Sequence, residues 1–304
     1  MGASRFMQGL YPLRMNHQIK AIVNVGDDVT IAGLHISPDL DTVTYALSGL
    51  VDETKGWGIS GDTFSFMEAL KRLDAAPYMA LGDMDLATHV YRTSRIQQGA
   101  KLEEVTTEIS TRLGVRIDII PATNDRLTSM VVVGGREVTF EEYFVRLKSE
   151  PFPEKVYFLG SASSRPPKRA VEAIRECDLL VIAPSNPVAS ISPILAVRGL
   201  YEEVAASQAY RIAVSPIVSG KTIKGPADKM LVSCGYEASV IGIARYYSGL
   251  IDGLVIDSVD SGLSDGVRRL GIDCFVTSTI MKDIESKVRL ANDVMKFAGS
   301  HRPT

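Results

Sequence analysis

Four aspartates in two short segments are the residues of this sequence that best support chemistry. Asp27 and Asp28 follow directly after the apolar run Ala21 to Val25, and Asp39 and Asp41 lie in the segment ISPDLDTVTY. Grouped carboxylates supply the oxygen ligands that Mg²⁺ prefers, and a bound Mg²⁺ can join them to phosphate oxygens. The four aspartates are therefore candidates for a site at which Mg²⁺ assists chemistry at a phosphate.

Helix physics offers a simpler explanation for part of this group. Ser37 can cap a helix that begins at Pro38, because the proline ring presets φ and its missing N–H would be unpaired there. Acidic side chains in the first turn then face the positive end of the helix dipole, which stabilises each by about 0.3–1 kcal/mol. This accounts well for Asp39, less well for Asp41, and not at all for the pair after the apolar run.

A second polar segment follows the apolar run DLLVIA. It reads PSNPVASISPIL, 184–195, and places Ser185 and Asn186 directly after that run. Ser192 and Pro193 repeat the pattern of a capping residue before proline, and a helix start there would turn backbone N–H groups toward an anion. The segment suits phosphate binding, and it equally suits a polar turn that caps itself.

Two further segments carry charge. Lys221 and Lys224 lie on the loop SGKTIKGPADKML, 219–231, where their charge would neutralise a diphosphate, although single lysines are more often solvated. LGDMDLATH, 81–89, places Asp83 at a helix start and His89 about two turns later. His89 could orient a substrate or a carboxylate, or simply pack. The only tryptophan, Trp57, could stack on a flat ligand or hold its loop in place.

Composition excludes several classes of protein. The chain has 304 residues, 45% of them hydrophobic, which is enough for a substantial core. A net charge of −3, without basic runs interleaved with aromatic residues, argues against a nucleic-acid partner. Three separated cysteines in apolar runs are typical of buried free thiols in a reducing compartment. No segment has the length of a membrane span or the layout of a signal peptide, so we expect a cytoplasmic protein.

Short β-branched runs alternate with helical patterns along the chain. Because these runs are apolar on both faces, they predict a parallel sheet covered by helices on each side. The fold class is α/β, a Rossmann-like doubly wound, mostly parallel sheet. The runs are KAIVNV (20–25), KVYFLG (155–160), DLLVIA (178–183), RIAVSPIV (211–218), GLVIDS (253–258) and DCFVTS (273–278).

The alternation of apolar runs with helical patterns is interrupted between residues 52 and 150. Helical stretches at about 83–98 and 101–113 precede MVVVGGREVTF, in which Gly134 and Gly135 join two strands as in a tight hairpin. We interpret 52–150 as a helical and hairpin subdomain inserted into one Rossmann-like domain, 1–304, because the core strands resume after it.

Seven blocks, in this order and with these gaps, resemble the 2-phospho-L-lactate transferases of coenzyme F420 biosynthesis. The resemblance covers nearly the whole chain, and seven ordered blocks are more specific than any single one. The blocks are NVGDD, GLHISPDLDTVTY, GWGISGDTF, LGDMDLATH, APSNPVASISPIL, VSPIVSGKTIKGPADKM and TSTIM.

The resemblance implies a Rossmann-like core, a homodimer and a Mg²⁺-dependent reaction. In that reaction the terminal ribityl hydroxyl of the deazaflavin Fo attacks the phosphate next to the three-carbon group of a guanylylated donor. GMP leaves, and F420-0 or its dehydro form is the product. A phosphoryl transfer of this kind needs mainly positioning and charge neutralisation, so no covalent nucleophile is required.

The resemblance also assigns roles to residues. It implies that Asp41 contacts the deazaflavin side and the metal, with Asp27, Asp28 and Asp39 as supporting metal ligands, and that Asp41 and Asp39 are catalytic. Ser185, Asn186 and Lys221 would lie toward the nucleotide. The predicted binding residues are Asp41, Thr42, Asp83, His89, Ser185, Asn186, Pro187 and Lys221.

The sequence departs from the family pattern in three places. Family members usually open with a strand and a glycine-rich turn, whereas the stated sequence starts at MGASRFMQGL, so that strand and the first glycines are absent. We expect a polypeptide that begins upstream, which intact-mass analysis of the native protein would test. Met84 also stands where many members have arginine, and Ser278 where a carboxylate is common.

Two other functions compete with this interpretation. A related nucleotide-sugar-binding regulatory protein would share the core without the reaction, but PDLDT and LGDMDLATH argue against it. An NAD-dependent dehydrogenase would need a GxGxxG motif that follows a strand and opens a helix; GWGISG, 56–61, matches the letters but follows no apolar run. The sequence does not distinguish lactyl, enolpyruvyl and glyceryl donors, because these differ by a few atoms.

Overall fold

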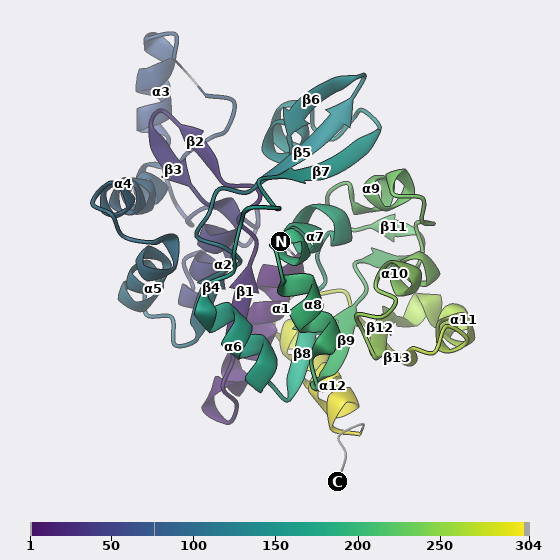
Figure 1. Cartoon of the computed structure of the whole chain (residues 1–304). Coiled ribbons are helices and arrows are strands. Elements are labelled where there is room, and N and C mark those ends of the chain that lie inside the picture. Colours follow the sequence, from purple (N-terminus) through teal and green to yellow (C-terminus); the bar gives the residue numbers. More distant parts are fainter. Residues whose placement is uncertain (1, 76, 301–304) are drawn as a thin grey trace.

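Two parallel sheets form the centre of the molecule. The computed structural model describes residues 2–75 and 77–300. A four-stranded parallel sheet has the order β13-β12-β9-β8, and a two-stranded parallel sheet pairs β1 with β4 (Figure 1). The core strands are β1 (Lys20–Val23), β4 (Asp118–Pro121), β8 (Leu179–Ile182), β9 (Tyr210–Val214), β12 (Gly253–Asp257) and β13 (Asp273–Thr277).

Apolar side chains leave both faces of the larger sheet and pack under helices. Ile212 and Val255 join one buried cluster with residues of α1 (Gly2–Leu10) and α12 (Ile284–Gly299). Ala213 and Leu254 join the opposite cluster, which includes residues of α8 (Leu200–Ala206), α9 (Ala227–Ser233) and α10 (Val240–Tyr246). The predicted α/β fold with a parallel sheet covered on two sides is confirmed.

A slot separates the two parallel sheets. A cavity of about 440 Å³ is lined by every residue of β1 and β8, and by α1 on one side. In the described residues β1 pairs only with β4 and β8 only with β9, so neither strand has a partner on the edge that borders the slot.

A small antiparallel sheet stands above the core in Figure 1. Its order is β6-β5-β7, and Gly134 and Gly135, with φ of +55° and +70°, form the turn between the first two strands. This confirms the predicted hairpin, since such a turn requires positive φ at both central residues. The strands are β5 (Thr128–Val133), β6 (Arg136–Thr139) and β7 (Lys155–Leu159), followed after β6 by the π-helix Glu142–Arg146.

Two strand predictions need correction. The run KVYFLG was expected in the parallel core, but β7 pairs antiparallel with β5 and both its ends are exposed. The core strand β4 was not predicted, because its four residues, DIIP, are few and end in proline. The range 52–150 therefore holds a core strand, parallel to β1, besides its helices and hairpin.

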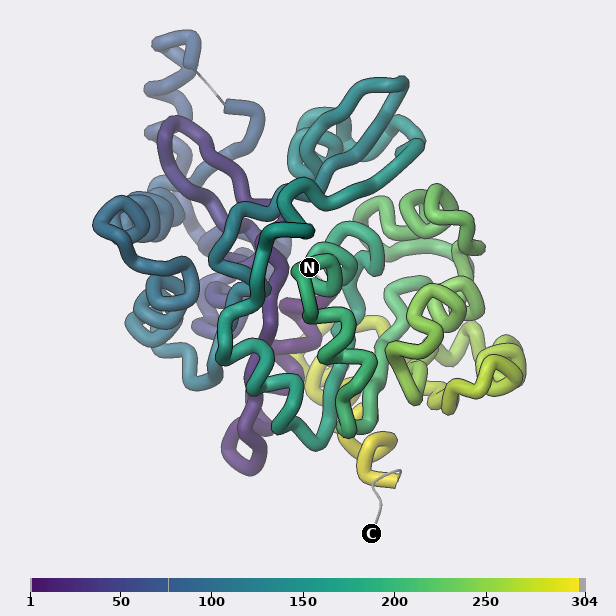
Figure 2. Tube along the Cα trace, in the orientation of Figure 1, coloured from purple at the N-terminus to yellow at the C-terminus, as the bar shows by residue number. Residues whose placement is uncertain are grey.

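Helices α3, α4 and α5 lie on one side of the molecule, as the blue segments of the tube in Figure 2 show. The predicted helical stretches at about 83–98 and 101–113 are confirmed as α4 and α5. The elements are the 3₁₀ helix Tyr11–Met15, β2 (Val29–Ile31), β3 (Leu34–Ile36), α2 (Pro38–Ser48), α3 (Ser65–Arg72), α4 (Asp83–Gln97) and α5 (Leu102–Arg112).

The second half carries the remaining helices and one short hairpin. None of the helices in 2–75 and 77–300 is both long and apolar enough to cross a membrane. Cys234 is exposed and the other two cysteines are half-buried, which corrects the expectation of buried thiols. The elements are α6 (Lys168–Glu176), the π-helix Pro187–Ile191, α7 (Ser192–Ala196), β10 (Ile217–Val218), β11 (Lys221–Thr222), the 3₁₀ helix Ser258–Leu263 and α11 (Ser264–Arg268).

The slot predicts uneven protection of backbone amides from hydrogen exchange. β9 and β12 have strand partners on both edges, whereas β1 and β8 have one each. Amides of β9 and β12 should therefore exchange more slowly than those of β1 and β8, because exchange follows local opening. Mass-spectrometric hydrogen exchange measures this, and equal protection in all four strands would show that the slot is closed in solution.

Candidate active site

A cavity of about 800 Å³ opens at the ends of the core strands. Its walls come from the segments that follow β1, β8, β9 and β13, from the start of α2, and from the hairpin sheet. Ligands of doubly wound sheets bind at this edge, because the helix starts and the loops after the strands converge there. Of the predicted site residues, the lining includes Asp27, Asp39, Asp41, Thr42, His89, Ser185 and Asn186.

Asp41 is held by a buried arginine. The guanidinium of Arg92, on α4, donates from both terminal nitrogens to the two carboxylate oxygens of Asp41, one of them at 3.1 Å. The two side chains are 2% and 7% exposed. Burial of both charges is unfavourable because each loses its hydration. The two hydrogen bonds between Arg92 and Asp41 offset that cost.

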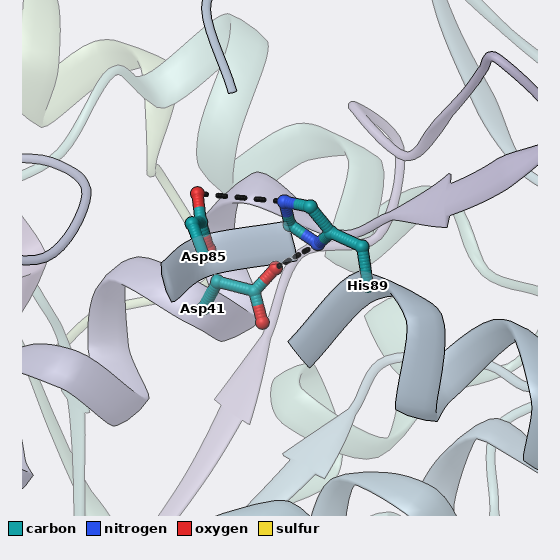
Figure 3. A group of neighbouring side chains, drawn as sticks. All are labelled: Asp41, Asp85 and His89. Carbon is teal, nitrogen blue, oxygen red and sulfur yellow. Dashed lines mark ion pairs between the residues drawn. The ribbon is translucent and has the colours of Figure 1, made fainter. Parts of the chain in front are cut away.

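Asp41 also belongs to a group with Asp85 and His89, whose ligand-type atoms lie within 4.8 Å of one another (Figure 3). The His89 ring lies between the two carboxylates, with Nδ1 3.6 Å from Asp41 and Nε2 3.4 Å from Asp85. Arg92 Nη1 also lies 3.4 Å from His89 Nδ1.

Tyr45 completes this group. Its hydroxyl lies 2.6 Å from Asp85 and 2.7 Å from Thr88. Burial, followed by the charges of Asp41 and Asp85, raises the pKa of Tyr45, so the phenol stays protonated as a donor. Burial also raises the pKa of Asp85, but His89 and Tyr45 outweigh it, so the pKa is lowered overall. Arg92 already balances the Asp41 charge, so this group fits a cation poorly.

Asp27 and Asp39 form a different group. The side-chain amide of Asn24 donates to both carboxylates, at 3.0 Å to Asp27 and 2.9 Å to Asp39. The Oδ1 atom of Asp27 is buried and has no hydrogen-bond partner in the described residues. Burial, with repulsion from Asp39 and Glu141, raises the pKa of Asp27 well above its usual range. A divalent cation fits this group, because it would satisfy the orphaned oxygen and offset both charges.

Asp28 is not among the cavity lining residues. Its Oδ2 atom lies 2.8 Å from His35 Nε2 and accepts a hydrogen bond from Ser37 at 2.8 Å. Burial raises the pKa of Asp28, against the opposing effect of His35. Ser37 and Pro38 do begin α2 as predicted, but the Ser37 hydroxyl binds Asp28 and makes no capping hydrogen bond. Asp28 thus links β3 and the start of α2 to the loop after β1.

Asp83, Pro187 and Lys221 lie outside the cavity lining. Asp83 begins α4 and accepts hydrogen bonds from Thr63 and from the backbone N–H groups of Ser65 and Phe66, so it organises the start of α3. Those hydrogen bonds lower the pKa of Asp83 to about 2. Lys221 is exposed on β11, whereas Lys224, three residues later, does line the cavity.

The segment after β8 differs from the prediction at its helix start. Asn186, and not Ser192, caps the helical segment, because its side chain accepts from the N–H groups of Val188 and Ala189. Ser192 donates instead to the carbonyl of Pro187 at 2.9 Å. The self-capping alternative therefore describes this turn, and its first N–H groups already have partners. Ser185 and Asn186 still face the cavity.

Cations line the cavity at Arg5, Lys224 and Lys282, which come from three separate segments. Arg5, on α1, donates to the carbonyl of Met281 at 3.1 Å. At Gly2, also in the lining, an added Cβ would come to 1.8 Å from the Pro184 carbonyl oxygen, so only glycine fits. The start of α1 and the loops after β8 and β13 meet here.

Sequence reasoning missed four residues of this site. Arg92 gave no signal beyond its position one helical turn after His89, Asn24 sat inside an apolar run, and Arg5 looked like an ordinary helix residue. Glu141 follows the hairpin, and its place in the lining depends on how that sheet folds back over α2. Each of these contacts joins segments far apart in the sequence.

Comparison with known proteins places the chain in a family. The family model described as 2-phospho-L-lactate transferase CofD matches residues 1–273. The 2-phospho-L-lactate transferase of Methanocaldococcus jannaschii is 36% identical over 98% of this chain and 96% of its own length. The phosphoenolpyruvate transferase of Streptomyces coelicolor is 38% identical over 98% and 95%. The chain belongs to the 2-phospho-L-lactate transferase family and is an enzyme of that family.

A solved structure shares the fold. The crystal structure of a member of the UPF0052 family from Bacillus halodurans superposes with a TM-score of 0.64, covering 97% of this chain and 96% of the other. At 18% sequence identity, this likeness concerns the fold. It confirms the Rossmann-like α/β architecture.

The buried pair predicts a large loss of stability when one partner is removed. Arg92→Ala should lower the free energy of unfolding by about 3–5 kcal/mol, because it leaves the Asp41 charge buried and unpaired. Urea unfolding measures the loss. Arg95→Ala, on the same helix, removes a pair with Glu108 whose side chains are 32% and 29% exposed, and should cost much less, because solvent screens that pair. Equal losses for the two variants would contradict this assignment.

Proposed function

From this family membership and this cavity, we propose that the chain transfers a phospholactyl or phosphoenolpyruvyl group from a guanylylated donor to the deazaflavin Fo. The ribityl hydroxyl of Fo forms the new P–O bond, the bond between the two phosphates breaks, and GMP leaves. The observation that carries the proposal is a cavity whose lining contains both acidic and basic side chains. Asp27 and Asp39, which share hydrogen bonds from Asn24, line it together with Arg5, Lys224 and Lys282.

Mg²⁺ is the cofactor of this proposal. Asp27 and Asp39 would hold it, since they share the Asn24 amide and one Asp27 oxygen lacks a partner. When bound, Mg²⁺ supplies charge neutralisation at the phosphoryl group. Asp41 takes a different part from the one the sequence indicated. Its carboxylate is occupied by Arg92, so it shapes the cavity floor and places Thr42 and Asp39, its neighbours on α2.

The two substrates would occupy different parts of the cavity. The cations Arg5 and Lys282 suit the diphosphate of the donor, which carries the negative charge. Trp57 and Tyr78 line the cavity and are 42% and 41% exposed, so they offer partly open rings to the flat deazaflavin. Asp39 then orients the ribityl hydroxyl and takes its proton as the P–O bond forms.

A homodimer, which the resemblance implied, and a cytoplasmic location, which the composition indicated, belong to the same proposal. The lactyl and enolpyruvyl donors remain alternatives, because the relatives named above carry either name.

A transfer assay tests the proposal. The purified protein, incubated with Fo, Mg²⁺ and a freshly generated lactyl or enolpyruvyl guanylylated donor, should yield GMP together with F420-0 or dehydro-F420-0 by mass spectrometry. Asp39→Asn should reduce the rate by about a hundredfold or more, because the hydroxyl loses its orienting carboxylate. The preferred donor would identify the three-carbon group.

Glu285→Gln serves as the control, because it removes one acidic charge from an exposed site on α12. Its rate should match that of the unaltered protein. If folded protein gives no product with either donor, the transferase proposal fails and a nucleotide-binding regulatory role takes its place.

A further inference from the structure

We propose that Lys287 is a positioning residue for the acceptor, because its ammonium group holds Glu53 and thereby fixes the loop that carries Trp57 in the cavity wall. The inference rests on the proposed function, in which Trp57 faces the flat ring of Fo, and it concerns a contact outside the sequence blocks that carry the family resemblance. Trp57 lies between α2 and α3 and lines the cavity together with its neighbours Gly56 and Gly58.

The loop 52–58 is closed on itself by hydrogen bonds, so it behaves as one unit. The N–H group of Asp52 donates to the carbonyl of Gly58 at 3.0 Å, and the N–H group of Gly56 donates to the carbonyl of Asp52 at 2.7 Å. The Asp52 carboxylate accepts from two further N–H groups of the loop. The position of Trp57 therefore depends on what holds this loop against the rest of the protein.

Glu53 attaches the loop to two helices. One carboxylate oxygen accepts a hydrogen bond from Nζ of Lys287, on α12, at 2.9 Å, and the other accepts from the side-chain amide of Gln8, on α1, at 2.7 Å. Lys287 Nζ also donates to Oε1 of Gln8 at 2.6 Å. The three side chains thus form a closed triangle of hydrogen bonds, and each of them comes from a different segment of the chain.

The charge of Lys287 lies inside the protein, and Glu53 balances it. The side chain of Lys287 is 5% exposed, whereas that of Glu53 is 54% exposed. A buried ammonium group needs an opposite charge, because it loses its hydration. Burial raises the pKa of Glu53, but the hydrogen bonds from Lys287 and Gln8 outweigh it, so the pKa is lowered overall and Glu53 stays ionised. The hydrogen bonds of Glu53 are therefore charge-assisted.

The two helices that hold Glu53 pack tightly against each other. At Gly9, next to Gln8, an added Cβ would come to 2.1 Å from the carbonyl oxygen of Lys287, so only glycine lets α1 and α12 approach this closely. Gln8 also donates to the carbonyl of Ala46, on α2, at 3.2 Å. Lys287 and Gln8 are therefore held in place by the core, and the loop is the part that their contact with Glu53 positions.

Fluorescence tests whether this contact holds the loop. Trp57 is the only tryptophan of the chain, so its emission reports on the loop alone. Glu53→Ala and Lys287→Met each remove the contact, while the bridge between Val51 and Ile59 still holds the base of the loop. Without ligand, both variants should lower the Trp57 anisotropy and strengthen acrylamide quenching by about twofold or more, because the loop gains freedom. The double variant should match the single ones, since all three remove one interaction.

Steady-state kinetics test whether the position of the loop serves the acceptor. Each variant should raise the KM for Fo by about tenfold, because a displaced Trp57 loses its contact with the flat ring. The KM for the guanylylated donor and the value of kcat should stay within about twofold of those of the unaltered protein. When Trp57→Ala is already present, Lys287→Met should raise the KM for Fo no further.

Lys296→Met is the matched control, because it removes a cation from an exposed position on the same helix. It should leave the Trp57 anisotropy and the KM for Fo unchanged. If Lys287→Met fails to fold, Glu53→Ala tests the same contact from its more exposed side.

Three results would overturn the inference. Unchanged anisotropy and quenching in Glu53→Ala would show that the contact does not position the loop. A loosened Trp57 with an unchanged KM for Fo would show that the position of the loop does not serve the acceptor. A further loss when Lys287→Met is added to Trp57→Ala would mean that Lys287 acts through the fold and not through Trp57. If the unaltered protein does not turn over Fo, the proposed function fails, and the fluorescence result still decides whether the contact holds the loop.

Discussion

The buried ion pair between Asp41 and Arg92 is the constraint on which the rest of the site depends. It joins α2 to α4, and the same α2 turn carries Asp39 and Thr42 into the cavity. With the Asp41 charge balanced by Arg92, the first turn of α2 also holds a second carboxylate, that of Asp39, in the cavity lining. The His89, Asp85 and Tyr45 contacts extend this anchor, since the His89 ring lies between two carboxylates and the Tyr45 hydroxyl donates to Asp85.

The carboxylates of the site therefore divide by their neighbours. Asp41 has a cation, Asp28 has His35, Asp27 and Asp39 share one neutral amide, and Glu141 has neither cation nor donor in the described residues. The same residue type can thus anchor a fold or, in the function proposed above, hold a divalent ion. Environment, and not the local motif, decides which role each one takes.

Much of the fold could be predicted from the sequence, since β12 is an apolar run buried on both faces and the Gly134–Gly135 turn requires positive φ. β4 could not, because four residues ending in proline carry too little pattern, and β7 was assigned to the wrong sheet because strand pairing is not local. At the site, motifs located Asp39 and Ser185, but Arg92, Asn24 and Glu141 reach it through contacts between distant segments. The sequence shows which side chains carry ring nitrogens or carboxylates, but it does not show which groups those side chains contact.

We propose that a divalent cation binds at Asp39 and not at Asp85. Measurement of cation binding tests this claim most directly. Mn²⁺, as a spectroscopic substitute for Mg²⁺, can be titrated into the protein in the presence of GDP and followed by electron paramagnetic resonance. The structure predicts that Asp39→Asn weakens Mn²⁺ binding while Asp85→Asn, in folded protein, leaves it nearly unchanged. Loss of binding in Asp85→Asn with retention in Asp39→Asn would place the metal at the Asp41, Asp85 and His89 group and contradict this account.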